Sequence, residues 1–384
     1  ATDSLNVAIG HLAGEKVTSG VQNTFIGGLS GDATTTGGTN TAVGYNSLTA
    51  NTTAANNTAV GFESLAANTT GHENTASGRR SLKSNTTGSD NTGFGNAAMF
   101  SNTTASANTA VGSGSLLSNT TGANNVAVGH DALGANTTAS GNSAFGKSAL
   151  TANTTGIGNN AFGIQCQNGT TTGNFNTAMG HVAMFTNQTG TDNTAFGSQA
   201  LYSATGTGNT VLGSTAGYAV STGSNNIYLG REAGRTGSPG GNQTDGSNEI
   251  GFGDENISTA SIQVDWTVAS DARDKTDFTA LDLGLDFVKA LAPVTYKWDK
   301  RSKYGDKTAD DYDLNAQSPD GTHKEDWLDI GFKAQEVEAL EQAAGYNKSN
   351  KTNLVSSHTG DGKQMGLQYS KFVPILVKAI QEQN

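Results

Sequence analysis

The chain has 384 residues, of which 33 are acidic and 22 basic, so its formal net charge at pH 7 is -11. No cluster of Lys and Arg stands out, which argues against nucleic acid as a partner, and no apolar run approaches the roughly 20 residues that a membrane helix needs. The single cysteine, Cys166, excludes an intrachain disulfide framework, and the six histidines show no ligand spacing, so we expect neither a metal site nor a cofactor.

A 17-residue repeat occupies most of the chain. Its clearest segment reads Asn-Thr-Ala-Val-Gly at residues 40–44 and again at 57–61, and the closing glycine returns every 17 residues from Gly10 to Gly197. A constant period over so many copies is typical of a solenoid, in which each repeat buries its apolar side against its neighbours. We therefore predict a mainly β protein in which residues 1–253 form a parallel β-roll.

Two apolar positions mark each repeat. The residue before the glycine is almost always large and apolar, as in Val43, and it follows Thr and Ala, which predicts a short strand with alternating faces. A second apolar residue lies four positions after the glycine, as in Leu48, and predicts a second, shorter strand. Asn-Thr-Thr segments such as residues 51–53 favour turns, and their stacked side chains would form ladders that hydrogen-bond from coil to coil.

Each predicted coil is thin. Seventeen residues enclose only one or two large side chains, and Cys166 stands where another repeat has Ala149, so we interpret it as a small buried residue. So small a core offsets chain entropy poorly in a monomer, and an oligomer with three-fold closure would bury a second face of every coil. The repeat resembles the head repeats of trimeric autotransporter adhesins, whose period is usually shorter, and similar repeats occur in phage tail fibres.

A short neck, residues 254–269, follows the roll. The segment at 236–241, rich in Gly and containing a proline, lengthens the last repeats and indicates that the array is ending. Apolar and polar residues alternate from Ser261 onward, which predicts a strand with one apolar face. That face would carry Ile262, Val264, Trp266 and Val268.

Residues 270–384 have an ordinary globular composition. They contain 19 acidic and 15 basic residues, whereas the roll and neck together contain 14 and 7. The patterns predict a small α+β domain with an amphipathic helix over 283–291 and a strand over 293–298. A charged insertion at 299–324, which we expect to be mobile, precedes a Gly-Phe-Lys-Ala-Gln-Glu-Val segment at 331–337.

The last predicted helix covers residues 369–384. Its apolar residues form one stripe suited to a trimeric coiled coil, namely Phe372, Ile375 or Leu376, and Ala379 or Ile380. Taken in order, the Ser-Asp-x-Arg-x-Lys motif at 270–275, the Pro-Val-x-Tyr-x-Trp strand, the Ala-Gln-Glu-Val segment and this helix resemble the endosialidase-type intramolecular chaperone domain of phage tailspikes and tail fibres. The resemblance covers essentially all of residues 270–384.

The resemblance implies a homotrimeric folding module that assembles the β-rich fibre and then cuts itself off before the serine of the motif. It places the scissile bond between Ala269 and Ser270, with Ser270 as the nucleophile and Lys275 as its base. Arg273 would position Asp271 or the scissile region. Two alternatives stay open: Asp271 as a simple turn cap, and Arg273 as one side of an interchain salt bridge.

This Ser-Lys chemistry is reasonable on physical grounds. A serine hydroxyl is a poor nucleophile until a base takes its proton, and a lysine can do so only when burial or nearby cations favour its neutral form. The pair would therefore be inactive on an unfolded chain, and cleavage would report trimer formation. Asp274, where the family often has an apolar residue, would favour protonated Lys275 and slow the cut.

We therefore expect a trimeric, phage tail-fibre-like adhesion protein with a single-turnover autocatalytic serine endopeptidase and no activity on an external substrate. Its partners would be two further copies of the chain and a host cell-surface glycan or protein, without nucleic acid or membrane insertion. It would reside on the virion tail, with the chaperone domain released after assembly.

Three other functions compete with this interpretation. A tailspike enzyme that degrades host surface glycan would need paired carboxylates, whereas the acids of the roll are scattered: Glu63, Glu73, Asp90 and Asp131. A bacterial trimeric adhesin on the cell surface would need a membrane anchor, which we do not find after the roll. An ice-binding roll is a remoter option, because the Thr-Thr pairs fall in a predicted turn.

Overall fold

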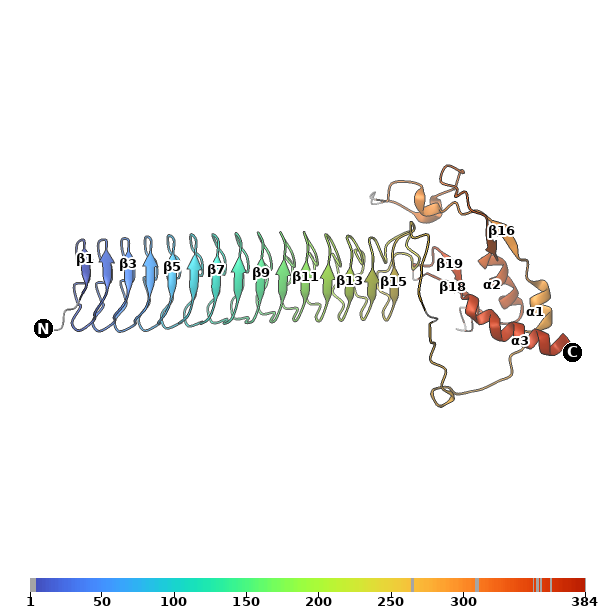
Figure 1. The fold of residues 1–384 in the computed structure, drawn as a ribbon, viewed down its shortest axis with the longest axis horizontal. Coiled ribbons are helices and arrows are strands. Elements are labelled where there is room, and N and C mark those ends of the chain that lie inside the picture. Colours follow the sequence, from blue (N-terminus) through green and yellow to red (C-terminus); the bar gives the residue numbers. More distant parts are fainter. Residues whose placement is uncertain are drawn as a thin grey trace. The chain divides into compact units, whose positions relative to one another are not determined.

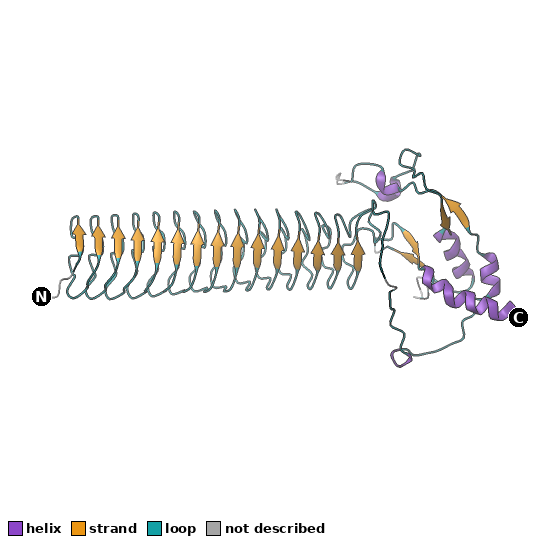
Figure 2. Cartoon of the chain, in the orientation of Figure 1, coloured by secondary structure: helices purple, strands orange, loops and turns teal. Residues whose placement is uncertain are grey.

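The chain forms two compact units in a computed structural model. The structure describes residues 5–263, 266–307, 311–347, 349, 352, 354–359 and 361–383. The units are Ala1–Ala233 with Thr244–Gly251, and Gly234–Gln243 with Phe252–Asn384. The first is the predicted parallel β-roll, and the helices of the described chain all belong to the second (Figure 1, Figure 2).

Short strands stack in chain order along the roll and pair in one parallel sheet of 15 strands in the described chain (Figure 1). They are β1 Val7–Ile9, β2 Thr24–Ile26, β3 Thr41–Val43, β4 Thr58–Val60, β5 Thr75–Ser77, β6 Thr92–Phe94, β7 Thr109–Val111, β8 Val126–Val128, β9 Ser143–Phe145, β10 Asn160–Phe162, β11 Thr177–Met179, β12 Thr194–Phe196, β13 Thr210–Leu212, β14 Ile227–Leu229 and β15 Ile250–Phe252. Equivalent residues lie side by side, Thr41 next to Thr58 and Val43 next to Val60. The predicted first strand is confirmed.

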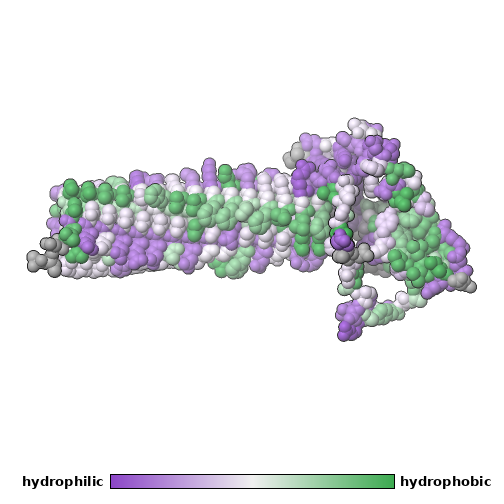
Figure 3. Space-filling model, viewed as in Figure 1, coloured by the Kyte–Doolittle hydropathy of each residue, from purple (hydrophilic) through white to green (hydrophobic). Residues whose placement is uncertain are grey.

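The alternation of side chains along these strands decides what the roll buries. In β3 the central Ala42 is fully buried, while Thr41 and Val43 face outward and are half-buried. The large apolar residues that precede the glycines therefore lie on the outer face, and several are well exposed, for example Phe94 at 56% and Leu212 at 53%. The view in Figure 3 shows apolar side chains in a band that follows the roll.

The predicted second strand is wrong. Leu48 is fully buried, as expected of a core residue, but it lies in a turn with a left-handed φ of 54°. The same conformation recurs four positions after the glycine in Leu65, Leu82, Met99, Leu116, Leu133, Leu150, Gln167, Met184 and Leu201. A left-handed residue with a side chain costs about 1–2 kcal/mol, which the burial of a leucine, about 1.5–3 kcal/mol, offsets.

The invariant glycine has a steric cause. Gly44 has a φ of +134°, and a Cβ on it would lie 2.6 Å from the carbonyl oxygen of Gly61 in the next coil. Any side chain at this position would push neighbouring coils apart, so the period of the glycine is the period of the coil.

Asparagine ladders run inside the roll, and the one in the turns was predicted. The Asn57 N–H donates to Oδ1 of Asn40 at 3.0 Å, and the Asn57 side-chain amide donates to the carbonyl of Gly71 at 3.0 Å. A second ladder joins the turns, where Nδ2 of Asn85 donates to Oδ1 of Asn68 at 2.9 Å. These bonds satisfy buried polar groups that the thin core could not otherwise hold.

The second unit is a small α+β body. Its helices are α1 Leu285–Ala290, α2 Ala334–Ala343 and α3 Phe372–Gln383; strand β16 Val294–Tyr296 pairs with β17 Asp329–Gly331, and β18 Ser356–His358 with β19 Met365–Leu367, both antiparallel. The core contains Leu283, Phe287, Val337, Val355, Phe372 and Ile375. The expected helix at 283–291 and strand at 293–298 are thus present in shorter form. None of the helices in the described chain is long and apolar enough to cross a membrane.

The apolar stripe predicted on the last helix is divided between two faces of α3. Phe372, Ile375 and Ala379 are buried within the chain, whereas Leu376 and Ile380 are exposed. Val373 and Val377 accompany the exposed pair, so α3 presents a second apolar face at helical spacing. Three-fold packing of this helix stays a prediction.

The neck and the insertion lie outside the regular elements. Of the strand predicted in the neck, residues 261–263 and 266–268 are described and are not in a strand; Val264 lies outside the described residues. Trp266 and Val268 are 75% and 78% exposed. The insertion at 299–324 contains two short 3-10 helices, Arg301–Lys303 and Leu314–Ala316, and Leu314 is buried.

Candidate functional site

The predicted site lies on an exposed, mostly irregular segment with one tight turn. Asp271 caps a 3-10 helix, Ala272–Asp274, by accepting a hydrogen bond from the N–H of Arg273 at 2.9 Å. Lys275 follows the helix as its carboxyl-terminal cap, and its N–H donates to the carbonyl of Ala272. An aspartate at this position favours such a turn because its side chain satisfies a backbone donor.

The turn brings the predicted nucleophile and base together. Nζ of Lys275 donates a hydrogen bond to Oγ of Ser270 at 2.6 Å, and Ala269 directly precedes the serine. The distance is within the range over which a base accepts a proton from a hydroxyl. The catalytic assignment of these residues stays a prediction.

Arg273 holds Asp271. Its Nε lies 3.1 Å from both carboxylate oxygens of Asp271, and Nη2 lies 2.6 Å from Oδ2. The side-chain hydrogen bond from Arg273, assisted by its backbone N–H, lowers the pKa of Asp271 and in turn raises the pKa of the guanidinium. Asp271 therefore caps the turn and pairs with Arg273 at the same time.

Ser270 and Lys275 contact each other, but both side chains are exposed to solvent. Ser270, Asp274 and Lys275 are all exposed, and no hydrogen bond or ion pair joins Asp274 to Lys275 in the described chain. The expectation that Asp274 favours protonated Lys275 and slows the cut stays a prediction. A lysine acts as a general base when water is excluded around it, so further protein surface would have to cover the pair.

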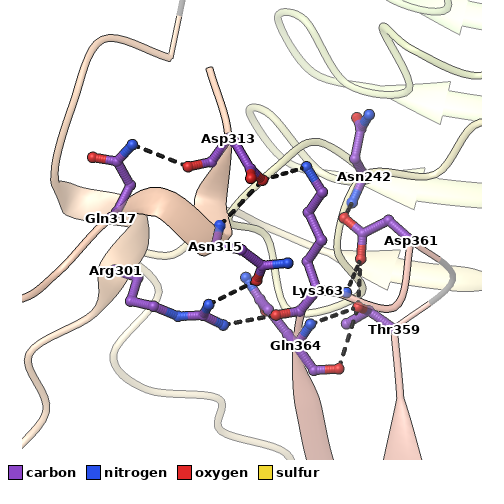
Figure 4. A network of polar contacts seen from close by, with 9 residues as sticks. All are labelled: Asn242, Arg301, Asp313, Asn315, Gln317, Thr359, Asp361, Lys363 and Gln364. Atoms are coloured by element: carbon purple, nitrogen blue, oxygen red, sulfur yellow. Dashed lines mark hydrogen bonds and ion pairs between the residues drawn. The ribbon is translucent and has the colours of Figure 1, made fainter. Parts of the chain in front are cut away.

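A polar network elsewhere in the second unit has no counterpart in the sequence analysis (Figure 4). Lys363 forms an ion pair with Asp313 at 2.8 Å, and Nη2 of Arg301 donates to the carbonyl of Lys363 at 2.7 Å. The hydrogen bond from Lys363 lowers the pKa of Asp313. Asp361 accepts from the backbone N–H of Asn242 at 3.0 Å. Polar residues scattered over loops give no periodic signal, so the sequence did not indicate this network.

The comparisons with known proteins address the carboxyl-terminal part. Residues 270–346 match the family described as the chaperone of endosialidase, beginning at Ser270 and ending beyond α2. The resemblance expected for this domain is confirmed over that range. No curated protein and no solved structure gives a significant match. The likeness of the roll to adhesin heads stays a prediction.

Proposed function

We propose that the protein is a phage tail-fibre-like adhesion protein that assembles as a homotrimer, and that its carboxyl-terminal domain directs assembly and then cuts the chain between Ala269 and Ser270. The observation that carries the proposal is that the start of the family match and the Ser-Lys contact fall on the same residue. The chaperone match begins at Ser270, and Lys275 contacts the hydroxyl of that same residue at 2.6 Å.

The reaction balances within the chain and one water molecule. Oγ of Ser270 attacks the carbonyl carbon of Ala269 while neutral Lys275 takes the hydroxyl proton. The Ser270 nitrogen leaves with a proton, which gives an ester between Ala269 and Ser270 that water then hydrolyses to a carboxylate and the free serine. Because the nucleophile stays on one product, each chain reacts once.

Two exposed apolar surfaces support assembly with further copies. The outer face of the strands carries large apolar residues from coil to coil, and Phe145 and Phe162 stack there with centroids 4.9 Å apart. Helix α3 exposes Leu376 and Ile380 beside its buried face. Continuous exposed apolar surface of this kind is typical of interaction sites.

Assembly explains both the chaperone and its timing. Every coil of the roll resembles the next, so three rolls could associate in many registers, and a domain with one fixed arrangement would select one of them. Association would also cover Ser270 and Lys275, which a single chain leaves exposed, and would favour the neutral lysine.

The roll is the part that would meet the host. Phe185, Tyr202 and Tyr218 stack in consecutive coils at centroid distances of 5.4 and 4.9 Å and are half-buried. Equivalent positions elsewhere hold Thr49, Ala66 or Gly134, so the coil does not require aromatic residues there. These rings support a contact surface for a host glycan or protein.

Intact mass and native mass of the purified full chain test the proposal. We expect fragments ending at Ala269 and beginning at Ser270, recovered from a trimer. Ser270→Ala and Lys275→Gln should stay uncut yet trimeric, whereas Ser261→Ala in the neck should be cut normally. An intact chain in a native trimer would refute cleavage, a split Ser270→Ala chain would refute the role of Ser270, and an intact monomer would refute the whole proposal.

A further inference from the structure

The last coil of the roll contains an insertion. Ladder positions are 17 residues apart in most coils. The backbone N–H of Glu249, however, donates to Oδ1 of Asn226, which lies 23 residues earlier. Most of the added length falls in Gly234–Gln243. This segment belongs to the same compact unit as Phe252–Asn384 and not to the unit formed by the rest of the roll. The insertion therefore packs with the carboxyl-terminal domain within one compact unit.

Polar contacts join this upstream part to residues beyond the scissile bond. The N–H of Asn242 donates to Oδ2 of Asp361 at 3.0 Å (Figure 4). Nζ of Lys300 donates to the carbonyl of Glu255 at 2.9 Å, and Lys307 forms an ion pair with the Glu255 carboxylate. Each contact has one partner before Ala269 and the other after Ser270, so none is removed when the peptide bond is cut.

Two glycines of the insertion lie against the downstream part. A Cβ on Gly241 would lie 2.8 Å from Cβ of Thr359 and 2.8 Å from Oδ1 of Asp361. A Cβ on Gly237 would lie 2.6 Å from Cβ of Ser302. The two surfaces are therefore complementary at the level of the backbone.

The contact is mostly polar. Glu255 is only 8% exposed, and its Oε2 has no hydrogen-bond partner among the described residues. Glu255, Trp298 and Gln364 help to line a cavity of about 510 Å³ between the upstream and downstream residues. Interfaces that are polar and incompletely packed are typical of transient association, whereas permanent ones are more apolar.

Asp361, which accepts the hydrogen bond from Asn242, is ionised at neutral pH. Burial would raise the pKa of Asp361, but hydrogen bonds from Thr359 and from the backbone of Lys363 and Asn242 outweigh it, so the pKa lies below its usual value. Together with the ion pair between Glu255 and Lys307, this places charged groups on both sides of the cut.

We propose that residues 234–243 and 252–257 form a docking surface for the cleaved carboxyl-terminal domain, which stays bound through residues 298–307, Thr359 and 361–365 until these polar contacts are broken. The inference rests on the proposed cleavage before Ser270. It makes dissociation a step separate from the cut. Because one ion pair and two hydrogen bonds that involve charged side chains hold the products together, dissociation accelerates as ionic strength rises.

Size-exclusion chromatography of the cleaved protein tests the inference. We expect the fragments to elute together at about 0.1 M salt and to separate at about 1 M salt. Glu255→Gln and Asp361→Asn should each speed dissociation about tenfold, since each removes the charged partner of a contact across the cut. Glu336→Gln is the matched control, because its ion pair with Lys333 lies wholly within the released part. Fragments that separate at once at low salt, or variants that behave like the control, would overturn the inference.

A glycine pair separates contact from backbone strain. Gly241 and Gly141 have φ values of +75° and +72°, but a Cβ on Gly141 would meet nothing within 4 Å. Gly241→Ala should weaken retention and Gly141→Ala should not. Equal retention in both variants would contradict the docking geometry.

A variant that is cut from outside separates docking from autocleavage. A protease recognition sequence placed between Thr267 and Val268 in the Ser270→Ala chain allows an added protease to cut the neck. Fragments that then stay together at low salt support docking even where no self-cleavage occurs. Fragments that separate at low salt would refute the docking surface but would not bear on the proposed self-cleavage.

Discussion

Gln167 is a polar residue at a position of the roll that is usually apolar. It occupies the buried left-handed position that Leu150 and Met184 fill in the adjacent coils, and it is fully buried. Its Oε1 has no hydrogen-bond partner among the described residues, and neither do Oδ1 of Asn153 and Oγ1 of Thr170 nearby in the sequence. The second asparagine ladder stops here because Thr170 stands where the preceding coil has Asn153.

Replacing Gln167 with leucine should stabilise the roll. We expect Gln167→Leu to raise the free energy of unfolding by about 1 kcal/mol, because a buried amide oxygen without a partner is exchanged for an apolar group. Denaturant unfolding of the two proteins measures it. Gln165→Leu, half-buried with a similar left-handed φ, is the control and should change little. A destabilised Gln167→Leu would mean that the bond from Nε2 to the Asn160 carbonyl, at 2.8 Å, outweighs the unpaired oxygen.

Cys166 should be chemically silent in the native roll. Its burial raises the pKa of the thiol to about 12, against the opposing effect of a backbone hydrogen bond from Phe162. Since the thiolate is the reactive form, alkylation at about pH 9 should label denatured protein and leave native protein unlabelled. The thiol becomes reactive only as the pH approaches its raised pKa. Rapid native labelling, followed by mass spectrometry, would show that the coil around Cys166 opens.

At this scale, contacts between residues close along the chain are easier to anticipate than contacts between distant ones. Ser270 and Lys275 are five residues apart with the capping Asp271 between them, and the family resemblance drew attention to the pair; its catalytic role stays a prediction. Asn242 and Asp361 are separated by 119 residues, and Glu255 and Lys307 by 52. Only the tertiary fold brings such pairs together, and their loops carry no period that would reveal it.

Among the elements, the first strand was predictable and the second was not. Alternation of Thr, Ala and Val fits extended backbone, and the structure places β3 and its equivalents there. Leu48 gives the same apolar signal four residues later, but its left-handed conformation is one that leucine rarely adopts. The coil accepts that strain because the turn directs the side chain into the core, a constraint that depends on stacking and not on local propensity.

In the proposed trimer, the two faces of helix α3 would have separate roles, one in folding and one in assembly. We expect Leu376→Ser with Ile380→Ser to leave the domain folded but to lower the native mass from trimer to monomer, because both side chains are exposed in one chain. Ile375→Ala should instead destabilise the domain by about 2–5 kcal/mol, since it empties part of the core. Circular dichroism and native mass spectrometry read the two effects. A double serine variant that stays trimeric would exclude this face from the interface.

For the whole molecule, the repeat makes the roll modular. Equivalent residues pair across 17 positions, so removing residues 103–119 rejoins each ladder one coil further on. We expect this deletion to keep β content and protease resistance. Deletion of residues 103–111 shifts the ladders out of phase and should expose the roll to proteolysis. Limited proteolysis of the two variants decides the matter, and equal resistance would show that the coils do not depend on register.

The hydrogen-bond ladders also determine how the roll would respond to force. Hydrogen bonds between coils run along the stacking direction. Under tension along the roll, the coil boundaries are therefore connected in series, and each carries the full load. A series of links fails at its weakest member, whatever the strength of the others. The boundary near Gln167 would be that member, because buried oxygens there have no partner among the described residues and one ladder ends, and its few side chains would set the tensile strength of the roll.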